Sequence, residues 1–358
     1  MTSDEMAKTW IPHLRGQFER ARPILFTGAG FSLESRNVQG EPLPTPADLR
    51  RKLWELCFPG TPIEDGSSLQ DLYEHSLLRH RKKLSELLLR ELTVDAESAP
   101  RWYGEIFSMA WQRIYTLNID DLPTATSRKY DLPRQIISVS ATNPSSHESA
   151  RNPAHAVEVV YLNGDLEDVP DHITFSVTQY AERLARPDPW YMRFSADLLT
   201  SPVVFIGTRL DESPLWQHLT MRQGGGGREM RELRHRSYLV TPTLDRARAA
   251  LLAEFNVVWI PMKAEEFAKN VLSQLKEASA SGLSFLNTRP LGEEGRAQKI
   301  AEVAELAADP SKQNQFLLGE EPVWADLQSG RAIEREMDVE IAKSVAHVMA
   351  EDIPLSSS

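Results

Sequence analysis

The chain has 358 residues, with 51 acidic and 40 basic side chains and a formal net charge of −11. This length allows one large α/β domain and a further segment. The negative charge argues against a broad nucleic-acid-binding surface. The single cysteine, Cys57, excludes an intrachain disulfide and fits a reducing compartment. With no long apolar stretch, the chain is expected to be a soluble cytoplasmic protein without a membrane partner.

The first motif follows a short apolar run. Apolar residues at helical spacing predict a helix over residues 2–20, and Ile24–Phe26 then predicts a buried strand. The strand ends in Gly28-Ala29-Gly30, with Ser32 close behind. Glycines at such a place let backbone N–H groups approach a phosphate, because no Cβ stands in the way. The spacing fits neither the common dinucleotide fingerprint nor a Walker loop, so this motif alone leaves nucleotide binding open.

After two amphipathic helices, predicted over residues 47–58 and 67–93, three more apolar segments end in polar turns. They are Ile114 followed by Thr116, Asn118, Asp120 and Asp121; Val159–Asp165, which contains Asn163; and Val203–Asp211, with Gly207 at its tip. Ligands of open α/β sheets bind outside the carboxyl ends of the strands, so these turns are predicted to meet in one crevice. Each turn taken alone is also explained as a turn that ends a strand and has no role in binding.

The remaining pattern predicts the rest of the sheet. Ser140–Pro153 indicates a surface loop, and Ile173–Tyr180 is predicted to begin as a strand and to enter a helix containing Trp190 and Tyr191. Ser237–Val240 and Val257–Ile260 indicate two more buried strands. The predicted fold class is α/β, a Rossmann-like, mostly parallel sheet flanked by helices, with helical insertions and a helical C-terminal extension.

The order of these motifs resembles the sirtuin fold over about residues 20–265. The motifs are Gly28-Ala-Gly-x-Ser32, Thr116-x-Asn118-x-Asp120, a strand ending at Asn163-Gly164, and Gly207-Thr-x-Leu210. Glu41–Leu49 is similar to the bacterial sirtuin-like branch found in antiphage defence proteins. One cysteine is too few for the four-cysteine zinc module of protein-deacylating sirtuins, which disfavours a deacylase and implies a site without metal.

The resemblance also suggests a domain organisation. Residues 1–268 would form the sirtuin-like NAD-binding domain, and residues 269–358 a helical connector. This tail looks like the connector that precedes a STAND-type NTPase module, although the chain has no Walker motif. The chain is therefore expected to be the N-terminal portion of a longer effector.

Sirtuin-like sites cleave the bond between nicotinamide and ribose in NAD⁺, and the resemblance implies a role for each motif. Gly28, Ala29, Gly30 and Ser32 would cradle the pyrophosphate, Thr116 would belong to the same binding site, and Gly207 and Thr208 would line the phosphate and adenosine-ribose side. Asn118 would orient water beside the nicotinamide ribose, and Asp120 would bind the carboxamide. Asp121 competes for that role, and either aspartate or Asn118 could instead cap a helix. Arg209 would either add charge near the phosphates or form an outward salt bridge.

Asn163 departs from the family pattern, which usually has a histidine acting as general base at this position. Asparagine keeps hydrogen-bonding ability but cannot accept a proton near neutral pH. Loss of a general base typically costs roughly 10²–10⁴-fold in rate. Three explanations stay open: an introduced substitution that traps NAD⁺, a naturally inactive domain, or replacement by His155 or His172.

The leading hypothesis is therefore an NAD⁺ glycohydrolase effector of a bacterial antiphage system. It would deplete the cell of NAD⁺ by releasing nicotinamide and ADP-ribose. The resemblance implies gating by homo-oligomerisation, by a C-terminal sensor module or by a phage-derived trigger. The alternative is a catalytically silent nucleotide-binding sensor or scaffold domain, which Asn163 favours.

Overall fold

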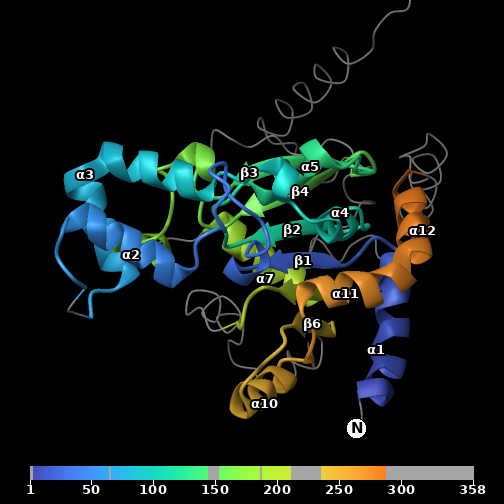
Figure 1. Ribbon diagram of the computed structural model, residues 1–358. Helices are drawn as coiled ribbons and strands as arrows, with labels where there is room; N and C mark the ends of the chain where they lie inside the picture. Colours follow the sequence, from blue (N-terminus) through green and yellow to red (C-terminus); the bar gives the residue numbers. More distant parts are fainter. Residues whose placement is uncertain (1–2, 64–65, 144–152, 186–187, 211–234, 288–358) are drawn as a thin grey trace, which may run out of the picture. The chain divides into compact units, whose positions relative to one another are not determined.

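The structure is a computed structural model that describes residues 3–63, 66–143, 153–185, 188–210 and 235–287 (Figure 1). All of these residues belong to one compact unit, Met1–Thr288. The predicted connector beyond residue 287 lies outside the described residues.

Seven strands form one sheet in the order β3-β4-β2-β1-β5-β6-β7, and each of the pairings in this sheet is parallel. The strands are β1 (Ile24–Thr27), β2 (Arg113–Thr116), β3 (Gln135–Ser140), β4 (Ala156–Tyr161), β5 (Val203–Ile206), β6 (Ser237–Val240) and β7 (Val257–Ile260). Thr27 lies opposite Thr116 on one side and Ile206 on the other, so the carboxyl ends of β2, β1 and β5 are level. The predicted α/β Rossmann-like fold is confirmed.

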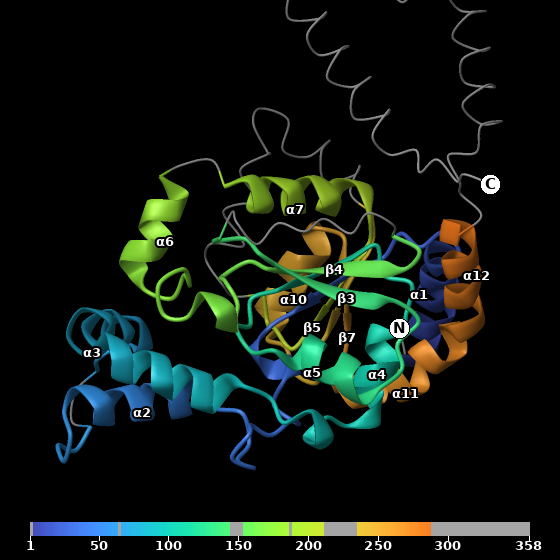
Figure 2. The same ribbon diagram turned by 90° about the horizontal axis from the view of Figure 1, so that it is seen from above.

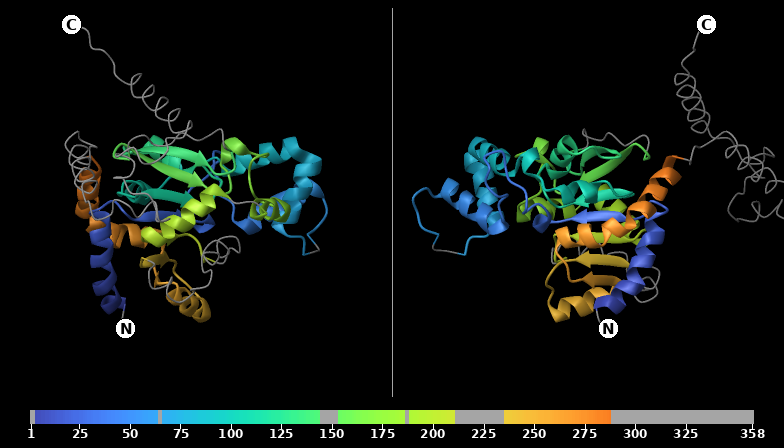
Figure 3. Two further views of the ribbon diagram at one scale, coloured as in Figure 1. Left: turned by 180° about the vertical axis from the view of Figure 1, so that it is seen from behind. Right: turned by 45° about the vertical axis from the view of Figure 1, so that its right-hand side comes forward.

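Helices cover both faces of the sheet (Figures 1 and 2). Packed on one face are α1 (Ser3–Phe18), α4 (Arg101–Phe107), α5 (Leu122–Lys129), α11 (Ala264–Asn270) and α12 (Lys276–Asn287). The other face is covered by α7 (Pro189–Thr200) and α10 (Arg246–Glu254). Figure 3 shows α12 beside α1, where the helices contact each other. Among the described helices, none combines the length and the apolar character that a membrane span requires.

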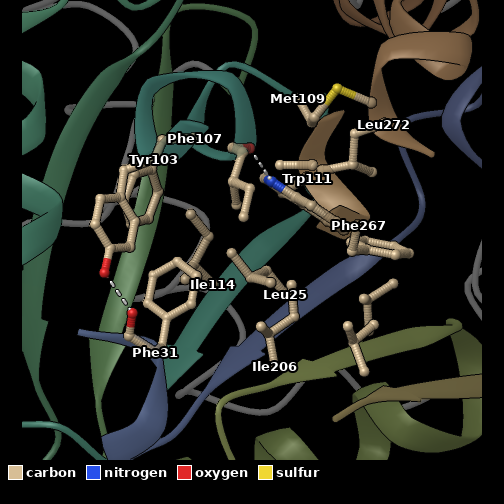
Figure 4. Packing of buried hydrophobic residues seen from close by; sticks show 14 of the residues in the cluster. Leu25, Phe31, Tyr103, Phe107, Met109, Trp111, Ile114, Ile206, Phe267 and Leu272 are labelled. Atoms are coloured by element: carbon tan, nitrogen blue, oxygen red, sulfur yellow. Dashed lines mark hydrogen bonds between the residues drawn. The ribbon is translucent and has the colours of Figure 1, made fainter. Parts of the chain in front are cut away.

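Successive side chains of the short strands point to opposite faces, which explains why their apolar runs are continuous. In β1, Leu25 joins the core under α4 and α11, whereas Ile24 and Phe26 join the core under α7. Figure 4 shows the first core, where Leu25 meets Ile114 of β2 and Ile206 of β5. All four positions of β1 are buried, and its one polar residue, Thr27, is the last.

Two further helices form a separate module at the carboxyl side of the sheet. They are α2 (Pro46–Cys57) and α3 (Leu69–Leu92), which lie side by side (Figures 1 and 2). Thr45 and Asp48 form a capping box that starts α2. Both helices were predicted, but α3 is interrupted at His80, whose backbone is not helical. The module has its own core, and Ile119 and Ile173 from the sheet domain pack into it.

Cys57 belongs to this module core. Its side chain is buried, and Sγ lies 3.0 Å from Ser76 Oγ. Within the described ranges, no group of three His, Cys, Asp or Glu side chains could hold a metal ion. The absence of zinc from this protein stays a prediction.

Two details of the predicted elements are wrong. Ile173–Phe175 is not a strand: Ile173 is buried in the module core, and the backbone N–H of Thr174 donates to Asn163 O at 2.8 Å. The helix predicted to follow is two helices, α6 (Val177–Leu184) and α7, because Asp188 caps α7 just before Pro189. The sequence pattern also missed β3, which ends at Ser140, where the surface loop was predicted to begin.

The segment after β7 is helical, as predicted, but in three pieces: α11, a 3₁₀ turn at Leu272–Leu275, and α12. Phe267 and Leu275 are fully buried in the main core. α12 lies so close to the end of α1 that a Cβ on Gly282 would be 2.0 Å from Phe18 O. Residues 269–287 thus pack against the sheet domain, and the proposed domain boundary after residue 268 stays a prediction.

Candidate functional site

Three loops meet at the carboxyl edge of the sheet, because β2, β1 and β5 are neighbours and end level with one another. They are residues 28–32 after β1, residues 117–121 after β2, and residues 207–210 after β5. This edge is where parallel sheets of this class bind ligands, and the connections of β1 to β2 and of β5 to β6 leave it in opposite directions. The loops contain the predicted site residues other than Thr116 and Asn163.

The loops after β1 and β5 interlock through their glycines. Gly207 has φ +72°, and a Cβ on it would lie 2.2 Å from the backbone nitrogen of Phe31. A Cβ on Gly28 would lie 2.8 Å from Thr208 Cβ, and one on Gly30 would lie 3.0 Å from Gly207 O. These glycines are therefore required by the packing of one loop on the other.

Backbone hydrogen bonds fix the same arrangement. Gly28 N–H donates to Ile206 O at 3.0 Å, and Gly30 N–H donates to Gly207 O at 2.8 Å. These two N–H groups therefore donate to carbonyl groups of the protein. The sequence instead predicts that the glycines give such N–H groups access to a phosphate. The Tyr103 hydroxyl donates to Phe31 O at 2.6 Å, as Figure 4 shows, and holds the loop from the α4 side.

A buried polar cluster lies where the loops after β1 and β2 meet. Asn118 Nδ2 donates to Ser32 Oγ at 2.9 Å, and both side chains favour the ionised form of the neighbouring Asp120 carboxylate. All three residues are at least nine-tenths buried. Thr116 lies behind them, where its Oγ1 accepts the backbone N–H of Asn118 at 3.0 Å. Thr116 therefore positions Asn118 from within the protein.

Burial raises the pKa of Asp120 to about 6, and hydrogen bonds from Ser32, Asn118 and the Leu122 backbone only partly oppose this shift. At pH 7 Asp120 is therefore mostly ionised and can only accept hydrogen bonds. Its Oδ1 also accepts Leu122 N–H at 3.2 Å at the start of α5, so it combines a capping role with a place in the cluster. Asp121 instead accepts Val94 N–H at 2.7 Å and lies 3.6 Å from Arg128.

We expect Asp120→Asn to stabilise the protein at pH 7 and to have a much smaller effect at pH 4. The folded-state pKa lies above the unfolded value of 3.8, so wild type loses stability as pH rises from about 4 through about 6. The penalty above pH 6 amounts to about 1–3 kcal/mol at 1.36 kcal/mol per pKa unit. Urea unfolding of both proteins at the two pH values measures it. An equal effect of the substitution at both pH values would contradict this assignment.

A small pocket is lined by all three residues of the cluster, and a larger cavity lies next to this pocket. The small pocket has a volume of about 120 Å³ and is lined mainly by apolar side chains from the loop after β1, from α2 and α3, and by Phe175, together with Ser32, Asn118 and Asp120. The larger cavity, about 560 Å³, extends along the sheet edge past Gly207 and Thr208 to the loops after β6 and β7. Ala29, Leu33 and Pro46 line both, so the two spaces adjoin at the loop after β1.

Asn163 follows β4, the neighbour of β2, and is 7% exposed. Its Nδ2 donates to Leu117 O at 3.2 Å, which ties it to the loop that carries Asn118. Its Oδ1 is buried and has no hydrogen-bond partner among the described residues. A buried polar atom without a partner is costly in a folded protein, so this oxygen is a candidate to accept from a bound ligand or water.

The two histidines considered as replacements lie elsewhere. His155 is exposed just before β4, whose six residues place it about 20 Å from the carboxyl edge, so it cannot act there. His172 is exposed and lines a separate cavity of about 720 Å³ beside α6. The His172 carbonyl packs against Gly164, whose Cβ would lie 2.6 Å from that oxygen.

Arg209 forms the outward ion pair of the two predicted alternatives, with Nη2 2.8 Å from the exposed Asp245. It also lines the larger cavity. Sequence reasoning missed several other lining residues, including Trp102, Thr241, Lys263 and Phe175. For Thr241 and Lys263 the sequence held one signal: each follows one of the last two apolar strands, β6 and β7. Trp102 and Phe175 reach the cavities through helix packing and an irregular loop.

Residues 112–260 match the family model of the SIR2-like domain. The match runs from the start of β2 to the end of β7 and includes Asn118, Asp120, Asn163 and Gly207. It supports a sirtuin-like domain and, with it, a function related to NAD. No curated protein matches the chain.

The residues of the site fit NAD, the nucleotide that SIR2-like domains bind. An apolar pocket edged by amide and carboxylate groups suits nicotinamide, whose ring is apolar and whose carboxamide both donates and accepts hydrogen bonds. The adjoining larger cavity can hold the rest of a dinucleotide. Asn163 is not among the described residues that line either cavity, so this fit rests on the other residues of the site.

Proposed function

We propose that this domain is an NAD⁺ glycohydrolase, which cleaves NAD⁺ to nicotinamide and ADP-ribose. The observation that carries the proposal is the buried Ser32–Asn118–Asp120 cluster, which lines a small apolar pocket that adjoins a larger cavity. Buried polar groups that converge on a cavity, one with a shifted pKa, are typical of functional sites.

In this proposal the nicotinamide occupies the small pocket. The ionised Asp120 carboxylate accepts a hydrogen bond from the carboxamide NH₂ group, a charge-assisted bond that fixes the orientation of the ring. The adenosine half extends into the larger cavity, and the loops of Gly28–Ser32 and Gly207–Thr208 flank the pyrophosphate between them.

The reaction needs little general-acid catalysis from the protein. Nicotinamide leaves from a cationic pyridinium, so the electrons of the broken ribose–nitrogen bond neutralise the ring. Water supplies the oxygen that bonds to the ribose carbon, and it releases one proton. Asn118 holds this water through its side-chain amide, and the buried carboxylate and amide dipoles stabilise the positive charge that develops on the ribose.

Asn163 favours a second candidate function, a domain that binds NAD⁺ without cleaving it. Its side chain cannot take up the proton that a histidine would accept. Binding would survive in such a domain, because the hydrogen bond between Asn118 and Ser32 does not involve the Asn163 side chain.

Nicotinamide release from NAD⁺ by the full chain separates the two functions. We expect release by wild type, and a loss of about 10²-fold or more in Asn118→Ala, which removes the group that orients water. Asn270→Ala is the matched control, since Asn270 is exposed on α11. Equal release by wild type and Asn118→Ala would refute the proposed mechanism. NAD⁺ binding without release would favour the silent domain.

We extend the proposal to a biological role as an effector of bacterial antiphage defence. In this role the protein acts as a homo-oligomer, and a C-terminal sensor module or a phage-derived trigger activates it. This role rests on the resemblance of the ordered motifs to the sirtuin fold and of Glu41–Leu49 to its antiphage branch. Cellular NAD⁺ should fall after phage infection of bacteria that express the protein, and an Asn118→Ala strain should keep its NAD⁺. A decline of equal size in both strains would exclude the role.

A further inference from the structure

The larger cavity is lined by basic side chains at the end far from the small pocket. From the loop after β1 it passes β5 and β6 to the loop after β7. Since neighbouring strands lie about 4.8 Å apart, this path spans about 14 Å of sheet edge. If nicotinamide fills the pocket beside β2, the adenosine half lies toward β6 and β7, so this inference rests on the proposed function.

Among the residues that the structure describes, those lining the far end include no carboxylate. The loops after β6 and β7 contribute Val240, Thr241, Pro242, Lys263 and Ala264 to the cavity. The described lining has one acidic residue, Glu34, and it belongs to the loop after β1, where its Oε2 accepts the Trp102 indole N–H at 3.0 Å. Doubly wound sites that select NAD over NADP use a carboxylate to bind the hydroxyls of the adenosine ribose, whereas a nearby cation accommodates a 2′-phosphate.

Two cations line the same end. Lys263 is exposed just before α11, and within the described residues its side chain forms no ion pair. Its backbone is fixed, because Lys263 N–H donates to Glu266 Oε2 at 3.0 Å. Arg209, after β5, is paired with Asp245, but both side chains are more than half exposed, so this pair is held weakly and can exchange partners.

We propose that the adenosine end of this site accepts a phosphorylated ribose, so that NADP⁺ is a ligand as well as NAD⁺. Lys263 supplies the positive charge for the additional phosphate, and Arg209 turns from Asp245 toward it. A phosphate at this place meets cations and, in the described lining, no carboxylate, which removes the repulsion that NAD-selective sites use against NADP.

Calorimetric titration of the full chain with NAD⁺ and NADP⁺ tests this specificity. We expect NADP⁺ to bind at least as tightly as NAD⁺. Lys263→Ala should weaken NADP⁺ binding about tenfold, the scale of a lost charge-assisted hydrogen bond, and should change NAD⁺ binding less than about twofold. Lys269→Ala is the control, because Lys269 is also on the exposed side of this region but pairs with Glu265.

A second ligand pair removes any effect of cleavage. Adenosine 2′,5′-bisphosphate and AMP differ only in the 2′-phosphate and contain no nicotinamide bond, and Lys263→Ala should weaken only the former. The inference would be overturned if the protein bound NADP⁺ more than about tenfold more weakly than NAD⁺. It would also be overturned if Lys263→Ala lowered the affinity for both dinucleotides equally. If neither dinucleotide binds, the proposed function itself fails.

Discussion

Replacement of Gly207 by alanine is expected to destabilise the protein by about 2–5 kcal/mol and to abolish nucleotide binding. The new methyl group would lie 2.2 Å from Phe31 N and 2.7 Å from Phe31 Cα, both backbone atoms that cannot move aside alone. The residue also has φ +72°, which is unfavourable for any side chain. The loop after β1 must therefore shift, and with it Ser32, which holds Asn118.

Gly60→Ala separates the effect of the steric clash from the effect of the positive φ angle. Gly60 has the same φ of +72°, but nothing lies within 4 Å of a Cβ built on it. The free energy of unfolding of Gly60→Ala should therefore fall only by the cost of the backbone conformation, about 1–2 kcal/mol. Urea unfolding gives both free energies. Equal losses in the two variants would show that the loops after β1 and β5 do not interlock as described.

Asn163→His should raise the rate of nicotinamide release by roughly 10²–10⁴-fold, the usual contribution of a general base. Asn163 Nδ2 donates to Leu117 O, and histidine Nδ1–H can keep this hydrogen bond. The ring then presents Nε2 as a proton acceptor. Turnover of NAD⁺ by both proteins, followed by released nicotinamide, measures the gain.

The control for this gain is His172→Asn in the wild-type background, which tests the other histidine considered as a replacement base. His172 lines the separate cavity beside α6, so its removal should leave nicotinamide release within about twofold. If Asn163→His binds NAD⁺ as wild type does but releases no more nicotinamide, Asn163 does not occupy the position of the base. That result would favour the silent binding domain.

The central strands β1 and β5 could be predicted from sequence because each contains a continuous apolar run. Val203–Ile206 is buried at each of its four positions, which leaves one interpretation of the run. β3 was missed because it lies at the edge of the sheet, where only its last two residues are buried, and serines interrupt its apolar residues. Ile173–Phe175 gave the opposite error, since its apolar side chains fill the core of the α2–α3 module instead of a sheet.

The candidate site was predictable only to the extent that it consists of strand ends. The polar residues after β1, β2 and β5 were identified, and the structure brings Ser32, Asn118 and Asp120 together. The sequence could not separate Asp120 from Asp121, because that depends on which carboxylate meets Val94 of a distant loop. It also could not show that Gly28 and Gly30 pack against the loop after β5, a contact between residues about 180 positions apart in the chain.

The central claim, that the pocket beside Asp120 binds the nicotinamide end of NAD⁺, is tested most directly by comparing two ligands. NAD⁺ and ADP-ribose should be titrated into wild type and Asp120→Asn at pH 7.5, since ADP-ribose lacks only nicotinamide. We expect the substitution to weaken NAD⁺ binding about tenfold or more, through loss of a charge-assisted hydrogen bond, and to leave ADP-ribose binding within about twofold. Equal weakening of both ligands, or a folded wild-type protein that does not bind NAD⁺, would contradict the claim.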